Sequence, residues 1–218
     1  MAPRPVLQEL ARRWLLAGGQ ALNVQALGGV EAARRVAQGD PADVVVLARE
    51  AIDTLITEGH LQAGSCQDLM RSLVAVAWPA GQPAPDLTGL PGLQQALLAA
   101  RRVAYSTGPS GQALLARLAQ WGLIEQIKDK LVQAAPGVPV GHLLAQGQAE
   151  LGFQQRSELM GLPDIEWALL PAEAEIVTVF SGALRARANL PESSAHWLAF
   201  CASAQAREVL LQHGMEPA

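Results

Sequence analysis

The stretch Val103–Leu118 reads VAYSTGPSGQALLARL and joins two kinds of local structure. The apolar run Val103–Tyr105 is typical of a short buried strand, and apolar residues recur at helical spacing after Gly111. Small and hydroxyl-bearing residues form the turn Ser106–Gly111 between them. Backbone N–H groups at a helix start, with hydroxyls beside them, suit a bound oxyanion; the alternative is that Ser110 caps its own helix. The stretch therefore predicts a strand, a turn and a helix of an α/β protein.

The composition narrows the class of protein. The 218 residues are 50% hydrophobic and carry 16 Lys and Arg against 20 Asp and Glu, a net charge of −4. Without a run of basic residues, a nucleic-acid partner is not expected. The apolar runs are too short for a bilayer span, so no membrane insertion is expected. The histidines and the two cysteines, Cys66 and Cys201, lack metal-ligand spacing, so we expect neither a metal nor a cofactor.

Short Val- and Leu-rich runs alternate with helical patterns along the chain. The predicted strands are Asn23–Leu27, Val44–Ala48, Leu73–Trp78, Val103–Ser106, Leu131–Gln133, Leu151–Gln154, Glu166–Leu170 and Ile176–Ser181. The predicted helices are Pro5–Leu16, Val30–Gln38, Arg49–Thr57, Leu90–Ala99, Ser110–Gln120, Val140–Gln146, Ser193–Cys201 and Ala204–His213. This alternation favours βα units and mostly parallel sheets, so the expected fold class is α/β.

Two segments share one pattern of residues. VAQGDPADVVVL (Val36–Leu47) and LAQGQAELGFQ (Leu144–Gln154) each end a helix with Ala-Gln-Gly, turn through an acidic residue and begin a strand. Any connection from a helix to a strand can converge on this chemistry, because glycine is favoured just past a helix. Similar units in the two halves of the chain are also what a two-lobed α/β protein would contain.

Four motifs carry a family resemblance. They are GGVEAARRVAQGDPADVVVLAREAIDTLITEGHLQAGS (Gly28–Ser65), VAYSTGPSGQALLARLAQWGL (Val103–Leu123), LLAQGQAELGFQQRSEL (Leu143–Leu159) and AHWLAFCASAQAREVLLQHGMEP (Ala195–Pro217). In this order they resemble the molybdate-binding-like branch of the bacterial extracellular solute-binding proteins. The resemblance implies a type II periplasmic-binding fold, in which two α/β lobes joined by crossing strands hold a ligand in the cleft between them. The implied lobes are residues 1–75 with 180–218, and residues 76–179.

The resemblance also implies the ligand-binding residues. Gly28 and Gly29 match a turn that offers backbone N–H groups, and Ser106, Thr107, Ser110 and Gly111 belong to the corresponding turn of the second lobe. Val140 begins a helix that faces the ligand in the family. Gln155 stands where molybdate binders usually carry a tyrosine, and its amide leaves room for a carboxylate. A small organic acid or another oxyanion is therefore expected as the ligand.

The start of the chain departs from the family. Members begin with a strand ahead of the helix that matches Pro5–Leu16, whereas only Met-Ala-Pro-Arg precedes that helix here. An incomplete first lobe would expose a strand edge, and a rearranged strand, another chain or residues outside this sequence could cover it. Pairing with another chain would give a homodimer. The resemblance implies the periplasm if an export signal lies upstream of this sequence, and otherwise the cytoplasm.

The expected function is capture of a small oxyanion or organic acid for an ABC-type importer, whose membrane component is then a partner. No catalytic spacing is present: Gly-Pro-Ser-Gly is not a nucleophile elbow, and Ser110 has no His or Lys nearby in sequence. The chain is therefore expected not to be an enzyme and to have no catalytic residue. The alternative is a shortened cytosolic relative that senses or transforms a small carboxylated metabolite.

Overall fold

A computed structural model describes residues 2–218 of the chain. These residues divide into two compact units, each described by itself below. Unit 1 contains the described residues up to Ser72 together with Thr178–Ala218, and unit 2 is Leu73–Val177.

Helices and strands alternate along most of the chain. The helices are α1 (Arg4–Leu16), α2 (Gly29–Ala37), α3 (Arg49–Thr57), α4 (Gly89–Ala99), α5 (Pro109–Gln120), α6 (Ile124–Ile127), α7 (Val140–Ala145), α8 (Arg156–Leu159), α9 (Pro191–Cys201) and α10 (Ala206–Gln212). The strands are β1 (Val44–Ala48), β2 (Gln67–Pro79), β3 (Val103–Tyr105), β4 (Leu131–Gln133), β5 (Leu151–Gln155), β6 (Ile165–Leu169), β7 (Val177–Leu184) and β8 (Glu216–Pro217).

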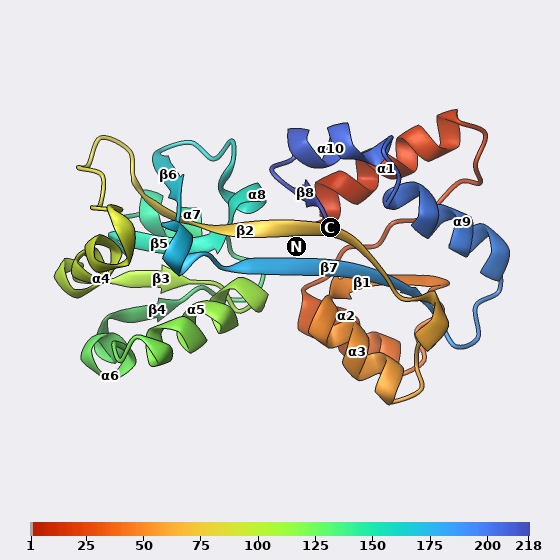
Figure 1. Cartoon of the computed structure of the whole chain (residues 1–218), viewed down its shortest axis with the longest axis horizontal. Helices are drawn as coiled ribbons and strands as arrows, with labels where there is room; N and C mark the ends of the chain where they lie inside the picture. Colours follow the sequence, from red (N-terminus) through yellow and green to blue (C-terminus); the bar gives the residue numbers. More distant parts are fainter. Residues whose placement is uncertain (1) are drawn as a thin grey trace. The chain divides into compact units, whose positions relative to one another are not determined.

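Unit 1 is built on β1, β7, the first part of β2, and β8. β1 pairs antiparallel with β7, from Val44 opposite Leu184 to Ala48 opposite Phe180. The helices α2 and α3 lie on one side of these strands, and α1, α9 and α10 lie on the other (Figure 1). Alternation along β7 explains the two layers, because Ala183 packs in the core with α2 and α3 while Phe180 packs with α1, α9 and α10.

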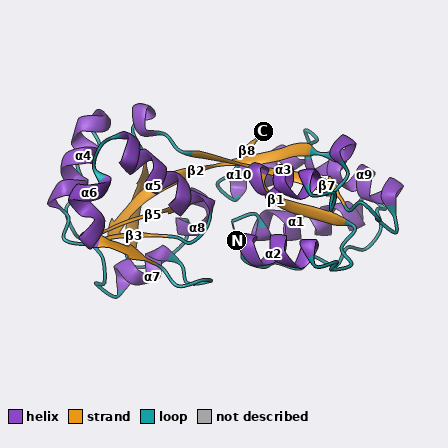
Figure 2. Ribbon diagram, turned by 90° about the horizontal axis from the view of Figure 1, so that it is seen from below, coloured by secondary structure: helices purple, strands orange, loops and turns teal. Residues whose placement is uncertain are grey.

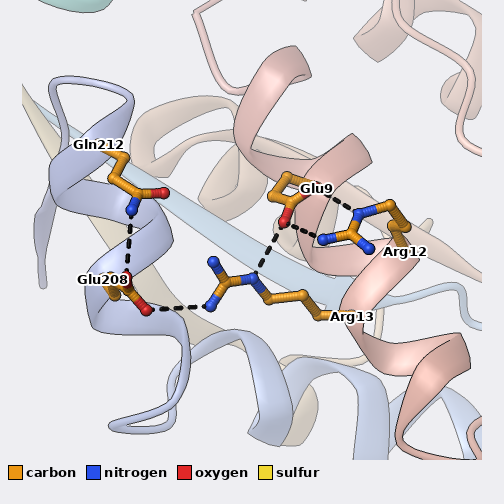
Figure 3. A network of polar contacts seen from close by, with 5 residues as sticks. All are labelled: Glu9, Arg12, Arg13, Glu208 and Gln212. Carbon is orange, nitrogen blue, oxygen red and sulfur yellow. Dashed lines mark hydrogen bonds and ion pairs between the residues drawn. The ribbon is translucent and has the colours of Figure 1, made fainter.

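Polar side chains join α1 to α10 on the surface of unit 1 (Figure 3). Arg12 and Arg13 both donate to the Glu9 carboxylate, at 2.8 and 3.0 Å. Arg13 also donates to Glu208 Oε2 at 3.2 Å, and Gln212 donates to Glu208 Oε1 at 3.1 Å. Arg13 therefore bridges a carboxylate of α1 and a carboxylate of α10.

Unit 2 contains a sheet of the second part of β2 with β5, β3 and β4 in that order, and β6 also pairs with β2. β3 is parallel to both β4 and β5, whereas β2 is antiparallel to β5 and β6. Figure 2 shows α4, α5 and α6 on one side of this sheet and α7 on the other. A hydrogen bond from Val74 N to Ile176 O, 2.9 Å long, joins the two ends of the unit.

The face of the unit 2 sheet that meets α7 is made of small residues. Ala75, Ala77 and Ala104 are fully buried there. At Gly152 a Cβ atom would lie 2.5 Å from Val140 Cγ1, closer than side chains can approach. The absence of a side chain at Gly152 therefore allows α7 to pack directly on β5.

Two features of the fold differ from the sequence expectations. The strand predicted at Asn23–Leu27 does not form: the described segment from Gly19 to Gly28 has no helix or strand, and most of its residues are exposed. Its apolar alternation indicates a strand, but a strand also needs a partner for its backbone groups. The expectation of mostly parallel sheets is met by β3, β4 and β5. In contrast, β7 pairs antiparallel with β1, and β2 pairs antiparallel with β5, β6 and β8.

Candidate functional site

The candidate site lies at the carboxyl ends of the parallel strands of unit 2. The β3–β5 register sets Tyr105 opposite Phe153, and the β3–β4 register sets Tyr105 opposite Gln133. The residues that follow these strands therefore emerge at one edge of the sheet. Ligands of open α/β sheets are usually bound at this edge. The edge includes the turn Ser106–Gly111, the residue pair Gln154 and Gln155, and the loop that leads from β4 to Val140.

The turn Ser106–Gly111 is held by its own hydroxyl groups. Ser106 Oγ and Ser110 Oγ lie 2.8 Å apart, and Gly108 N donates to Ser106 Oγ at 3.3 Å. Ser110 is buried, with 2% of its surface exposed, whereas Ser106 and Thr107 are partly exposed. Ser110 does not cap its own helix, because the N-cap of α5 is Gly108 and no side chain caps it. The turn thus brings four predicted ligand residues together: Ser106, Thr107, Ser110 and Gly111.

Gly111 is required by close packing within this turn. A Cβ atom at this position would lie 1.8 Å from Ser106 O and 3.1 Å from Tyr105 Cδ2. Gly111 N also donates to Gly108 O at 3.0 Å. Only glycine lets the first turn of α5 lie directly against the end of β3.

The backbone N–H of Val140 is occupied by a side chain. It donates to Gln154 Oε1 over 2.8 Å, and both residues are buried. Val140 was predicted from the sequence to offer this group to a ligand. In the structure, the Gln154 carbonyl satisfies it, and Gln154 was not among the predicted site residues.

The remaining predicted residues lie in two places. Gln155 is buried at 2% exposure, pairs with Val74 in the β2–β5 ladder and precedes α8. Gly28 and Gly29 belong to unit 1, where Gly28 is the exposed N-cap of α2. A Cβ atom at Gly28 or Gly29 would have nothing within 4 Å, so packing does not demand glycine at either position. Within unit 2, the predicted residues all follow or end strands at the same edge of the sheet.

Sequence reasoning missed one further polar group beside Gln155. Ser157 Oγ is buried and has no hydrogen-bond partner within residues 2–218. The sequence did not indicate that Ser157 is a site residue, because a serine near a helix start is ordinarily a capping or surface residue. Together, the two serines of the turn, Gln154 and Ser157 provide hydroxyl and amide groups without a formal charge. Such groups bind carboxylates and other oxyanions by hydrogen bonding.

A charged cluster in unit 1 has a different character. Arg49 begins α3 and donates to Asp53 and to Asp68, each at 2.9 Å. The Ser181 hydroxyl donates to Asp68 Oδ1 at 2.6 Å. Hydrogen bonds from Ser181 and then from Arg49 lower the pKa of Asp68, whereas burial raises the pKa of the neighbouring Cys66 thiol. Because two carboxylates already engage the Arg49 guanidinium, this cluster is better suited to holding α3 in place than to binding an anion.

The architecture is that of the two-lobed periplasmic binding proteins, as similar solved structures show. The periplasmic molybdate-binding protein of Azotobacter vinelandii matches with a TM-score of 0.78 and 20% identity, over 98% of this chain and 94% of that one. L-phospholactate-bound PEB3, a Campylobacter jejuni protein, matches with a TM-score of 0.75 and 14% identity, over 100% of this chain and 96% of its own.

The chain belongs to the bacterial extracellular solute-binding protein family, whose model matches residues 1–216. A relative named aconitate isomerase, from a Pseudomonas species, is 35% identical over 184 residues, which are 84% of this chain and 70% of the relative. The family and the molybdate-binding-like fold confirm the resemblance drawn from the sequence motifs.

This relative corrects one expectation. The sequence led us to expect that the chain is not an enzyme, because no catalytic spacing is present. The relative with 35% identity is named for a catalytic activity, which overturns that expectation. Spacing along the sequence is a poor guide in a two-lobed fold, because catalytic groups far apart in sequence can converge in space.

None of the helices formed by residues 2–218 combines the length and the apolar character that crossing a membrane requires.

Proposed function

We propose that this protein binds a small polycarboxylate at the carboxyl edge of unit 2 and interconverts its cis and trans isomers, with aconitate as the substrate. The single observation that carries the proposal is the 35% identity to an aconitate isomerase over 84% of this chain. The molybdate-binding protein and PEB3 share at most 20% identity with the chain, and that likeness bears on the fold alone.

The residues at the site are compatible with such a substrate. Aconitate carries three carboxylates and one carbon–carbon double bond. The turn Ser106–Gly111 and the amides of Gln154 and Gln155 could supply donors to carboxylate oxygens. Gln155, which replaces the tyrosine of the molybdate binders, supports a carboxylate ligand rather than molybdate.

The reaction itself is balanced without an oxidant or a reductant, because substrate and product are isomers. A proton that leaves the methylene carbon of aconitate and returns at the vinylic carbon shifts the double bond by one position. The product then has the same constitution as the substrate, and its double bond can have the other geometry, cis or trans. The serines, the glycines and the glutamines at the site are suited to binding and orienting the substrate, since none of them titrates near neutral pH.

The test is direct. The purified protein is incubated separately with cis-aconitate and trans-aconitate, and proton NMR follows the appearance of the other isomer. We expect both incubations to converge on the same mixture. Isomer ratios that stay unchanged over hours at micromolar protein would contradict the proposed activity.

A second candidate function is capture of a small anion for an ABC-type importer, in the periplasm. The family match over residues 1–216 favours it, since the family is named for solute binding. Calorimetric titration with cis- and trans-aconitate, citrate, sulfate, phosphate, tungstate and molybdate separates the two candidates. Tight binding of one anion without any isomerisation would support capture over catalysis.

The ligand residues can be tested in the same titration. Ser110→Ala combined with Gln155→Ala removes two donors, and hydrogen bonds to a charged ligand are worth about 1.5–3 kcal/mol each. We expect the affinity for the bound anion to fall by about two orders of magnitude or more. An affinity equal to that of the parent would remove both residues from the site.

A further inference from the structure

Gln154 is a buried polar side chain at the candidate site that contacts a second element. It has 5% of its surface exposed, and its Oε1 accepts the Val140 N–H at 2.8 Å. In a helix the N–H bonds point toward the N-terminus, so an acceptor of the first N–H lies beyond the start of the helix. The amide group of Gln154 therefore lies in front of α7, at the carboxyl edge of the strands.

The backbone around this hydrogen bond leaves α7 little freedom. Gly152 meets Val140 and Leu144 so closely that a Cβ atom would lie 2.5 and 3.0 Å from their side-chain atoms. Gly141 of α7 packs against Leu162, and a Cβ atom at Gly141 would lie 2.6 Å from Leu162 Cδ1. With α7 held in this way, the hydrogen bond to Val140 fixes which end of the Gln154 amide is the carbonyl and which is the NH₂ group.

Within residues 2–218, the NH₂ group of Gln154 is not used. Among residues 2–218, no carbonyl, carboxylate or hydroxyl oxygen accepts a hydrogen bond from Gln154 Nε2. In the part of the chain that the structure describes, Gln154 Nε2 is not among the fully buried atoms that lack a partner, so water or a ligand can reach it and accept its hydrogen bonds. The orientation set by Val140 thus leaves two N–H bonds for a molecule at the site.

We propose that Gln154 is a ligand-orienting residue whose Nε2 donates a hydrogen bond to a carboxylate of the substrate, while Val140 locks the amide in the required orientation. The inference rests on the proposed function for the chemical class of the ligand. It also explains why Val140 N–H need not contact the ligand: its role is to direct a side-chain donor.

The decisive variant is Gln154→Glu, which keeps an oxygen acceptor for Val140 N–H and replaces the NH₂ donor with a negative charge. The matched control is Gln148→Glu, which makes the same charge change at an exposed position of unit 2. The affinity of each variant for trans-aconitate is measured by calorimetry at pH 8 and near pH 5. Each value is divided by that of the parent at the same pH, so that ionisation of the ligand cancels.

At pH 8 we expect Gln154→Glu to bind trans-aconitate about 10- to 100-fold more weakly than the parent, because one donor is lost and a like charge is added. Burial raises the pKa of a carboxyl group, so the variant should regain part of its affinity near pH 5 as the glutamate takes up a proton. Gln148→Glu should bind within about twofold of the parent at both pH values.

Hydrogen exchange separates ligand orientation from a purely structural role. The Val140 amide should stay protected in Gln154→Glu, whose carboxylate still accepts it, and should exchange faster in Gln154→Met, which has no acceptor. Equal affinity of Gln154→Glu and the parent at pH 8 would overturn the proposal. So would weakened binding that is accompanied by loss of Val140 protection in Gln154→Glu.

The outcomes also separate this inference from the proposed function. If the parent neither binds nor isomerises aconitate but binds citrate or another anion of the panel, the aconitate activity is wrong, and the same variants are compared with that anion. If the parent binds no anion of the panel, the role of Gln154 is wrong as well.

Discussion

At the scale of single residues, Gly111 fixes the geometry of the turn Ser106–Gly111, because its α-carbon lies against the backbone of Ser106. We predict that Gly111→Ala destabilises the protein by more than about 2 kcal/mol, since the new methyl group meets backbone that cannot rotate away. Urea denaturation followed by circular dichroism measures the loss. An unchanged midpoint would mean that α5 does not begin against the end of β3.

The control for this variant is Gly29→Ala. Gly29 is the first residue of α2, and a Cβ atom there would have nothing within 4 Å. Alanine is a better helix residue than glycine by up to about 1 kcal/mol, so the stability of this variant should be unchanged or slightly higher. The pair of variants separates a packing effect from a general intolerance of substitution.

The same scale shows where prediction of the site from sequence ends. Alternation along β5 correctly assigns Gln154 and Gln155 to opposite faces, and only one of the two was selected as a ligand residue. The hydrogen bond that makes Gln154 notable reaches Val140, which lies on another element. No spacing in the sequence encodes that contact, because it depends on how closely α7 approaches Gly152.

At the scale of elements, prediction succeeded where the signal is local. The bounds of β1, α3 and β4 are the predicted ones, since short apolar runs and adjacent helical patterns define them. Asn23–Leu27 has an equally strand-like pattern and forms no strand. Strand formation depends on a neighbouring strand, so alternation alone could not decide it. The short helices α6 and α8 were missed because four residues are too few to show helical periodicity.

The link between α1 and α10 gives a prediction about pH (Figure 3). Hydrogen bonds from Arg12 and then Arg13 lower the pKa of Glu9 from 4.5 to about 2. A pKa that is lower in the folded state than in the unfolded state contributes stability above the unfolded value, and this contribution is lost as the pH falls through the folded value. The contribution of Glu9 should therefore be complete at neutral pH and disappear between pH 4.5 and about 2.

Thermal unfolding of the parent and of Glu9→Gln measures this effect. The parent should have the higher Tm at pH 7, and the difference should shrink as the pH is lowered through that window. Glu50→Gln, at an exposed glutamate of α3, is the control and should show no such convergence. A Tm difference that is the same at pH 7 and at pH 3 would mean that Glu9 is not held by the two arginines.

At the scale of the whole molecule, unit 2 is one continuous segment, whereas unit 1 takes residues from both ends of the chain. The ends of unit 2 are joined by the hydrogen bond from Val74 N to Ile176 O. We predict that the fragment 73–177 folds by itself, because it keeps its own core on both faces of its sheet. A cooperative thermal transition with dispersed amide signals in NMR is the expected result. A fragment without a cooperative transition would show that the unit needs the rest of the chain.

The discontinuity of unit 1 has a consequence for synthesis on the ribosome. β1 emerges early, but its antiparallel partner β7 and the final strand β8 leave the exit tunnel only after Leu73–Val177 has done so. Protease digestion of chains stalled at increasing lengths should therefore find unit 2 protected before β1. During that interval the apolar side chains of α1 lack the residues of α9 and α10 against which they pack, and β1 lacks its backbone partner. The first segment to be translated is thus among the last to acquire its structure.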